Sequence, residues 1–101
     1  MSSESTVWEF PLTGKETTIV MPRDAVVLGV AILKELSPLG EAAHILALCN
    51  PGSPQFDERK FVVFDTGDLI DSASHNYVGS VHPAPEIAWH VFEKFEKGNG
   101  Q

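Results

Sequence analysis

Lys60-Phe61-Val62-Val63-Phe64-Asp65-Thr66 is the stretch of sequence that decides the fold. Its four central residues are aromatic or β-branched, and charged or hydroxyl residues bound them on both sides, which is typical of a β-strand. The Thr66-Gly67-Asp68 segment that follows predicts a tight turn. Because a strand is not stable by itself, the flanking sequence must supply further strands that pair with this one.

Short apolar runs separated by turn residues continue on both sides of this segment. The further strands that we expect are residues 6–12, 17–21, 25–33, 42–49, 76–82 and 87–92. Two of them have a helical alternative, because segment 42–49 contains good helix formers and segment 87–95 also fits a helical face. The pattern predicts a mainly β fold: a small antiparallel β-sandwich or barrel of about seven strands, with little helix.

Single residues predict some details of the strand arrangement. The two N-terminal strands are separated by the turn candidate at residues 13–16 and are expected to form a hairpin. Pro11 favours an edge strand or the end of a strand, because proline cannot donate a hydrogen bond to a ladder. The almost wholly apolar segment 25–33 is expected at the centre of a sheet with both faces covered, and Gly29 within it predicts a bulge or a close backbone approach.

The length and composition are those of one small globular domain. The chain has 101 residues, of which 43% are hydrophobic and 21% charged. We expect a disordered N-terminus over residues 1–5, a single β-rich domain over 6–95 and a frayed C-terminal tail over 96–101. The one cysteine, Cys49, excludes an internal disulfide framework and stands in an apolar run, so we expect a buried, inert thiol. A domain this small buries only about two-thirds of its unfolded surface, so we expect a homo-oligomer.

The charge and the motifs exclude several classes of protein. Fourteen acidic residues against seven basic ones give a net charge of −7, which argues against a general nucleic-acid-binding protein. No apolar run reaches the roughly 20 residues of a transmembrane helix, and the first residues lack the features of a signal peptide. We therefore expect a cytoplasmic protein that contacts neither membrane nor nucleic acid directly. The four histidines lack zinc-site spacing and no phosphate-binding loop is present, so we expect neither a metal nor a cofactor.

Asp65-Thr66-Gly67 at the end of an apolar strand resembles the way aspartic proteases present a catalytic carboxylate. In those enzymes two carboxylates share one proton. Here Asp68 adds a further acid directly after the glycine, and the motif lies past the middle of the chain. Asp65, Asp68 and Asp71 also lack the alternation of acids found in calcium loops. A strand that ends in a solvated acidic turn is the simpler interpretation.

An ordered series of segments resembles a known family. The segments are Met21-Pro22 with residues 25–28, then residues 45–51, 61–67 and 77–81, and finally Trp89-His90-Val91-Phe92-Glu93. Over residues 6–93 this order is similar to a family of small phage- and prophage-encoded proteins of unknown function. The chain departs from the family pattern at Leu46, where tryptophan is common, and at Asp65, where glycine is common. The resemblance implies a protein that acts in the cytoplasm of a bacterial host, where small phage proteins often oppose immune defences.

The first functional hypothesis is a non-enzymatic counter-defence protein that binds and sequesters a small nucleotide-type host immune signal. Such a site needs an aromatic ring to stack on a base, and backbone N–H or basic groups for phosphate. The candidate ligand-binding residues are Arg59, Thr66, Gly67, Tyr77, Trp89 and His90. No catalytic residue is expected, and sites of this kind often form between the subunits of an oligomer.

Other classes of function stay open. An anti-CRISPR-like inhibitor would bind a host immune protein, with its acidic surface occupying a basic groove on that partner. An aspartic-protease-like enzyme at Asp65 is a further alternative, and a small accessory part of a virion is another.

Overall fold

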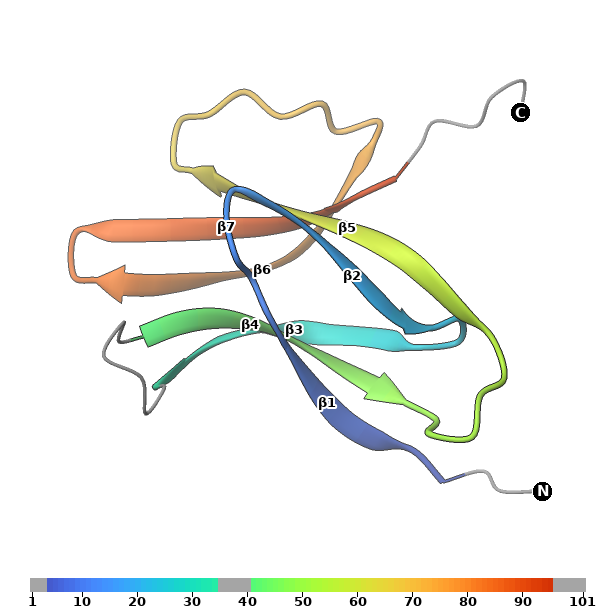
Figure 1. Ribbon diagram of the computed structural model, residues 1–101. Coiled ribbons are helices and arrows are strands. Elements are labelled where there is room, and N and C mark those ends of the chain that lie inside the picture. Colours follow the sequence, from blue (N-terminus) through green and yellow to red (C-terminus); the bar gives the residue numbers. More distant parts are fainter. Residues whose placement is uncertain (1–3, 35–40, 96–101) are drawn as a thin grey trace.

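The structure, a computed structural model, describes residues 4–34 and 41–95 (Figure 1). It contains the strands β1 (Thr6–Pro11), β2 (Glu16–Pro22), β3 (Val26–Lys34), β4 (Glu41–Cys49), β5 (Phe56–Asp65), β6 (His75–Ala84) and β7 (Ile87–Lys94). No helix occurs in the described ranges, so the predicted mainly β fold is confirmed. Both segments with a helical alternative are strands. The predictions for the extreme ends of the chain fall on residues 1–3 and 96–101, which lie outside the described residues.

The strands form two antiparallel sheets, β1-β4-β3 and β2-β5-β7-β6. The predicted N-terminal hairpin is wrong, because β1 pairs with β4 and β2 pairs with β5. One backbone hydrogen bond on each side of the turn extends these two strand pairings. Leu12 N donates to Ala43 O at 2.9 Å, and Val63 N donates to Lys15 O at 2.8 Å. The turn therefore passes the chain from one sheet to the other, and this lets both strands turn an apolar side toward the core.

Strand β3 also departs from the prediction. It lies at an edge of the three-stranded sheet, not at a centre, and Val26 and Leu28 are 56% and 54% exposed. Its apolar residues therefore cover the core with one side only. The expected bulge at Gly29 is confirmed, since the register between β3 and β4 shifts between Val27 and Gly29. The edge position predicted for the strand that contains Pro11 is confirmed as well.

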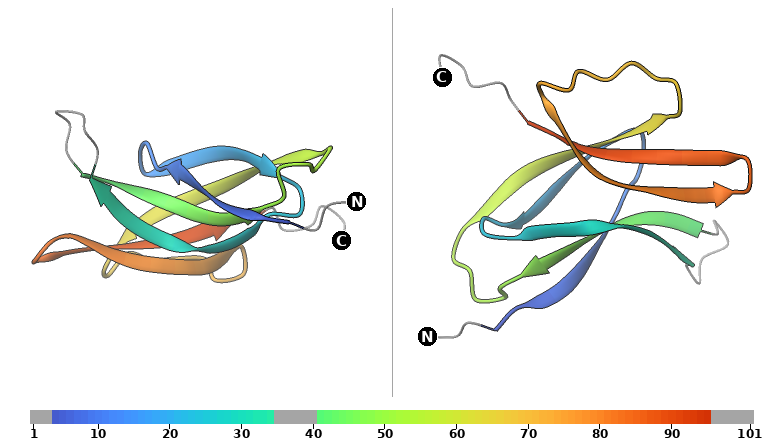
Figure 2. Two further views of the ribbon diagram at one scale, coloured as in Figure 1. Left: turned by 90° about the horizontal axis from the view of Figure 1, so that it is seen from below. Right: turned by 180° about the vertical axis from the view of Figure 1, so that it is seen from behind.

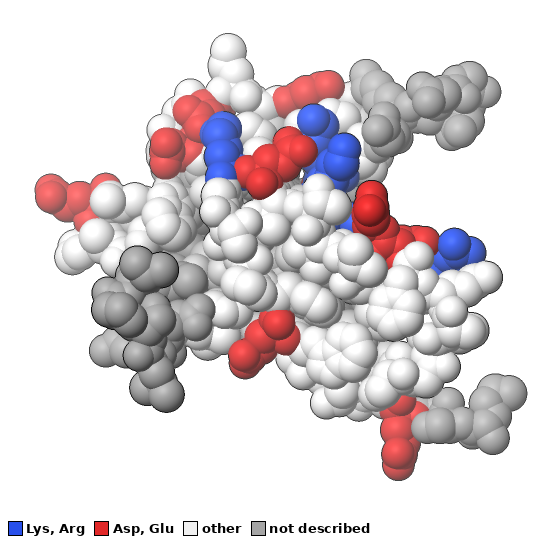
Figure 3. All heavy atoms as spheres, in the orientation of Figure 1, with Lys and Arg blue, Asp and Glu red and all other residues white. Residues whose placement is uncertain are grey.

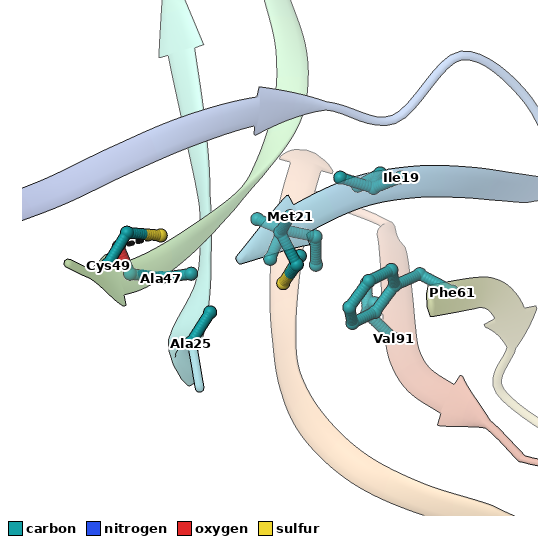
Figure 4. Close-up of a cluster of buried hydrophobic side chains, with 8 residues drawn as sticks. Ile19, Met21, Ala25, Ala47, Cys49, Phe61 and Val91 are labelled. Atoms are coloured by element: carbon teal, nitrogen blue, oxygen red, sulfur yellow. Dashed lines mark hydrogen bonds between the residues drawn. The ribbon is translucent and has the colours of Figure 1, made fainter. Parts of the chain in front are cut away.

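The inner sides of the two sheets enclose one hydrophobic core (Figure 4). Its buried members are Ile19, Met21, Phe61 and Val91 from the four-stranded sheet, and Ala25, Ile45, Ala47 and Cys49 from the other side. Each large side chain buried in this way stabilises the fold by about 1.5–3 kcal/mol. The Cys49 thiol is fully buried, as expected, and Sγ donates to Ala47 O at 3.7 Å.

The two sheets approach each other most closely where β3 and β6 lie side by side (Figure 2). Gly79 of β6 makes this approach possible, because a Cβ atom there would lie 3.0 Å from Val30 Cγ1. These two strands are edges of different sheets and share no ladder. The fold is therefore a β-sandwich whose layers close toward a barrel along one side.

Candidate ligand-binding site

The C-terminal end of β5 positions most of the residues predicted for the site. In the register between β5 and β7, Asp65 lies opposite Trp89 and Phe64 lies opposite His90. Because successive side chains of a strand point to opposite faces, Trp89 faces the interior between the sheets and His90 faces outward. The sequence neighbours Trp89 and His90 therefore belong to two different surfaces.

The turn after β5 is held by its own acidic residue. Asp68 N donates to Asp65 O at 3.0 Å, and the Asp68 carboxylate accepts the Asp65 N–H at 2.8 Å. Gly67 has a φ of 100°, which side-chain-bearing residues rarely adopt. The next acid, Asp71, accepts the Ala73 N–H at 3.0 Å. Each of these contacts is local to a turn, and the described residues contain no group of three potential metal ligands.

On the outer face, a chain of hydrogen bonds joins Thr66, His90, Ser80 and Tyr77. Thr66 Oγ1 lies 2.6 Å from His90 Nε2, His90 Nδ1 lies 2.8 Å from Ser80 Oγ, and Ser80 Oγ lies 2.6 Å from the Tyr77 hydroxyl. A neutral imidazole has one donor and one acceptor nitrogen. Either tautomer can therefore complete the chain of hydrogen bonds, provided that all hydroxyl groups donate in the same direction along it. The chain holds these side chains in place.

Ser80 is the member of this chain that the sequence did not indicate. In a regular strand Tyr77 would share a face with Gly79, not with residue 80. The register between β6 and β7 shifts between Tyr77 and Gly79, and this bulge brings Ser80 to the face of Tyr77. The sequence feature that could have indicated this bulge is Gly79, since an isolated glycine in a strand often marks one.

An aromatic cluster supports the outer face beside this chain. The Tyr77 ring packs edge-on against Phe92 at 5.3 Å between centroids, and Phe92 packs against Phe64 at 5.6 Å. Tyr77 is 62% exposed, whereas Phe64 is buried. The outer face thus presents one exposed aromatic ring beside hydroxyl groups that already have hydrogen-bond partners.

A cavity opens on the other side of the same strand end. It has a volume of about 390 Å³ and is lined by Leu12, Gly14, Lys15, Ala43, Val63, Asp65 and Trp89. Most of its wall is apolar, and the exposed Lys15 and Asp65 stand at its mouth. Among the described residues, no hydrogen bond or ion pair of the Asp65 carboxylate is found, so its oxygens are open to a ligand. Of the six predicted residues, only Trp89 lines this cavity.

Arg59 does not belong to either surface. Its Nε and Nη2 donate to the two Glu93 oxygens at 2.6 and 2.7 Å, and Nη1 donates to Ala25 O at 2.9 Å. The hydrogen bond to Glu93 raises the pKa of the guanidinium further above its usual value. Arg59 lies six positions before Asp65 on β5, which is roughly 20 Å along a strand. Arg59 therefore stabilises the opposite end of the sandwich.

Most described basic side chains have an acidic partner. Lys15 lies 3.8 Å from Asp68, Arg23 lies 3.1 Å from Asp57, and Lys94 lies 3.8 Å from Glu16. On the face shown in Figure 3 the acidic side chains are scattered, and several stand beside basic ones. This face therefore carries no concentrated patch of either sign. No helix in the described part of the chain is long and apolar enough to cross a membrane.

Comparison with known proteins identifies one family. A family model described as a domain of unknown function (DUF7352) matches residues 3–100, which is nearly the whole chain. No curated protein and no solved structure gives a significant match. The family description names no catalytic activity.

Proposed function

Because the chain belongs to this family of domains of unknown function, we propose a function from the cavity itself: a non-catalytic protein that binds a small molecule. The ligand that we propose is of nucleotide type, with its planar ring packed against Trp89 between the two sheets. The observation that carries this proposal is the apolar cavity of about 390 Å³ with Trp89 in its wall. Its size lies in the range of pockets that take small molecules, roughly 300–1,000 Å³.

The polar groups at the mouth define the chemistry of the ligand. The Asp65 carboxylate is acceptor-only when ionised, so it favours a ring edge that carries N–H or NH₂ donors. The Lys15 side chain is 67% exposed and lines the same cavity. Its ammonium donates to Val63 O at 3.0 Å and lies 3.8 Å from Asp68, and it is the cation that we propose meets a phosphate outside the cavity. A nucleotide whose base carries donor groups on its edge matches both features. The proposed role is to sequester such a signal in a bacterial host during phage infection.

Two of the alternative functions, the protease and the inhibitor, have less support. A proton-sharing pair at Asp65 needs a second carboxylate, but the carboxylate of Asp68 is engaged with the Asp65 backbone N–H. An inhibitor that mimics nucleic acid needs a concentrated acidic surface, and the one face shown in Figure 3 does not supply it, because its acidic groups are dispersed. The cavity therefore favours a binding protein over either alternative.

Native mass spectrometry of protein purified from bacteria with active immune systems, followed by fluorescence titration, tests the proposal. We expect a reproducible adduct of nucleotide mass. The titration uses guanosine and adenosine monophosphates as probes and a Trp8→Phe variant, in which Trp89 is the one remaining tryptophan. Ligand entry is expected to quench its emission.

Two substitutions make the test decisive, and isothermal titration calorimetry measures their affinities, because Trp89→Ala removes the tryptophan whose emission the fluorescence titration follows. Trp89→Ala removes the ring contact, and Asp65→Asn changes the acceptor at the mouth; each should weaken binding at least tenfold, about 1.4 kcal/mol. Tyr77→Phe is the matched control, because it alters an aromatic residue outside the cavity and should leave affinity unchanged. An unmodified mass together with no quenching by either probe would overturn the proposal, as would equal affinity in Trp89→Ala.

A further inference from the structure

The outer face of the β1-β4-β3 sheet exposes a continuous apolar surface. In the register, Val7 of β1 and Val26 of β3 flank Leu48 of β4, and Leu28 follows in the bulge of β3. These four side chains, 38–56% exposed, are called the apolar patch below. Singly exposed apolar residues are ordinary, but a group that spans all three strands of a sheet indicates a contact surface.

The patch is almost free of charge, although the chain as a whole carries −7. Among described outward-facing side chains of this sheet, Glu9 of β1 is the one Asp, Glu, Lys or Arg. A basic partner would gain nothing here, whereas an equally flat and uncharged sheet face would fit.

We propose that this partner is a second copy of the chain, bound through the same patch. Two sheets can pack face to face about 10 Å apart, as the layers of a β-sandwich do. A two-fold axis along β4 would lay β1 of each copy over β3 of the other. The two Glu9 side chains would then stand at opposite rims and would not face each other. The contact is isologous and leaves the cavity beside Trp89 accessible, so it does not depend on the proposed ligand.

The size of the patch sets the strength of the dimer. Three strands about 4.8 Å apart, over roughly seven residues, give a footprint of about 320 Å² per copy. A standard interface buries about 800 Å² per partner, so the expected dimer is weak and reversible. Repulsion between two copies with a charge of −7 weakens it further, and added salt should therefore strengthen the association.

Sedimentation velocity over a concentration series from about 1 μM to 1 mM tests the dimer. The weight-average mass should rise from 11.0 kDa toward twice that value, and should rise at lower concentration in added salt. Val26→Glu places a charge in the patch and should weaken association at least tenfold. Val20→Glu is a matched control, because Val20 is 57% exposed against 56% for Val26 and lies in the other sheet.

Every outcome decides for or against the interface. Val7→Glu, on a different strand of the patch, repeats the test in case Val26→Glu does not fold, and circular dichroism checks the folding of each variant. The proposal is overturned if the wild-type chain stays monomeric up to about 1 mM. It is also overturned if the patch variants associate like the wild type. Loss of association in Val20→Glu alone would assign the contact to the four-stranded sheet.

Discussion

The Arg59–Glu93 pair is less exposed than the other ion pairs described above. The two side chains are only 22% and 19% exposed, and the guanidinium also reaches the backbone of Ala25 at the entrance to β3. A bidentate pair of this kind joins β5, β7 and the start of the other sheet. Its loss would leave a half-buried cation without its carboxylate, which costs more than the pair itself contributes.

Replacement of Glu93 is therefore expected to destabilise the fold. Glu93→Gln keeps the shape of the side chain but removes its charge, and should lower the free energy of unfolding by about 2 kcal/mol. Urea unfolding measures this change. Asp57→Asn is the control, because it removes the carboxylate beside Arg23, which is 59% exposed, and should cost under about 0.5 kcal/mol. Equal losses in the two variants would contradict a supporting role for Arg59.

At the scale of the elements, the contact between β3 and β6 depends on one glycine. A Cβ atom at Gly79 would lie 3.0 Å from Val30 Cγ1, so this β-branched side chain would have to shift by a few tenths of an ångström, whereas the 3.7 Å to Val30 N is an ordinary contact. Gly79→Ala is expected to lower the free energy of unfolding by about 1–2 kcal/mol through overpacking. Thermal unfolding followed by circular dichroism measures it.

A substitution at a second glycine distinguishes overpacking from the loss of backbone conformational freedom. Gly29→Ala adds a methyl group within the bulge of β3, where nothing lies within 4 Å, and should cost little. Val30→Ala removes the atom that the new Cβ would meet, so the double variant should lose less stability than the two single variants together. If the losses of the two single variants simply add in the double variant, the effect of Gly79→Ala arises from the backbone and not from the contact between β3 and β6.

The strands of this chain could be predicted from local patterns, but their partners could not. Alternation and β-branched residues in stretches such as 17–21 and 61–64 report a half-buried or buried strand. Pairing is a non-local property: β1 leaves the expected hairpin because Trp8 and Phe10 pack against the core from the other sheet. The apolar composition of β3 likewise indicated a covered strand, whereas part of its surface forms the apolar patch.

The candidate site could be predicted only in part, because strand pairing decides which of its residues meet. Thr66 and His90 come together because β5 and β7 pair directly. Ser80 was missed because a bulge changes which face it occupies. Arg59 was selected for its charge, but its partner Glu93 comes from a strand that only the tertiary structure brings near.

At the scale of the whole molecule, burial of Cys49 links global unfolding to pH. Burial in the core is the largest cause that raises the pKa of this thiol above its ordinary value, and the Asp24 carboxylate adds to it. The unfolded chain loses the thiol proton as the pH rises through about 8.5, while the folded chain keeps it. Unfolding then releases a proton, so the contribution of the thiol to stability is complete below that pH and falls above it.

The expected result is a difference between two pH profiles. Urea unfolding with reductant at pH 7, 8, 9 and 10 should show the wild-type chain more stable than Cys49→Ala at pH 7, since the substitution leaves a small cavity. This difference in the free energy of unfolding should shrink above about pH 8.5, by up to about 1.4 kcal/mol per pH unit, until the pH reaches the pKa of the thiol in the folded chain. Lysine and tyrosine titrations are common to both chains and cancel in the difference. Parallel profiles across the whole range would mean that the thiolate is no less stable in the folded core than in water. That outcome would contradict the tight packing around Ala47 and Cys49, because a closed apolar core cannot solvate a charge.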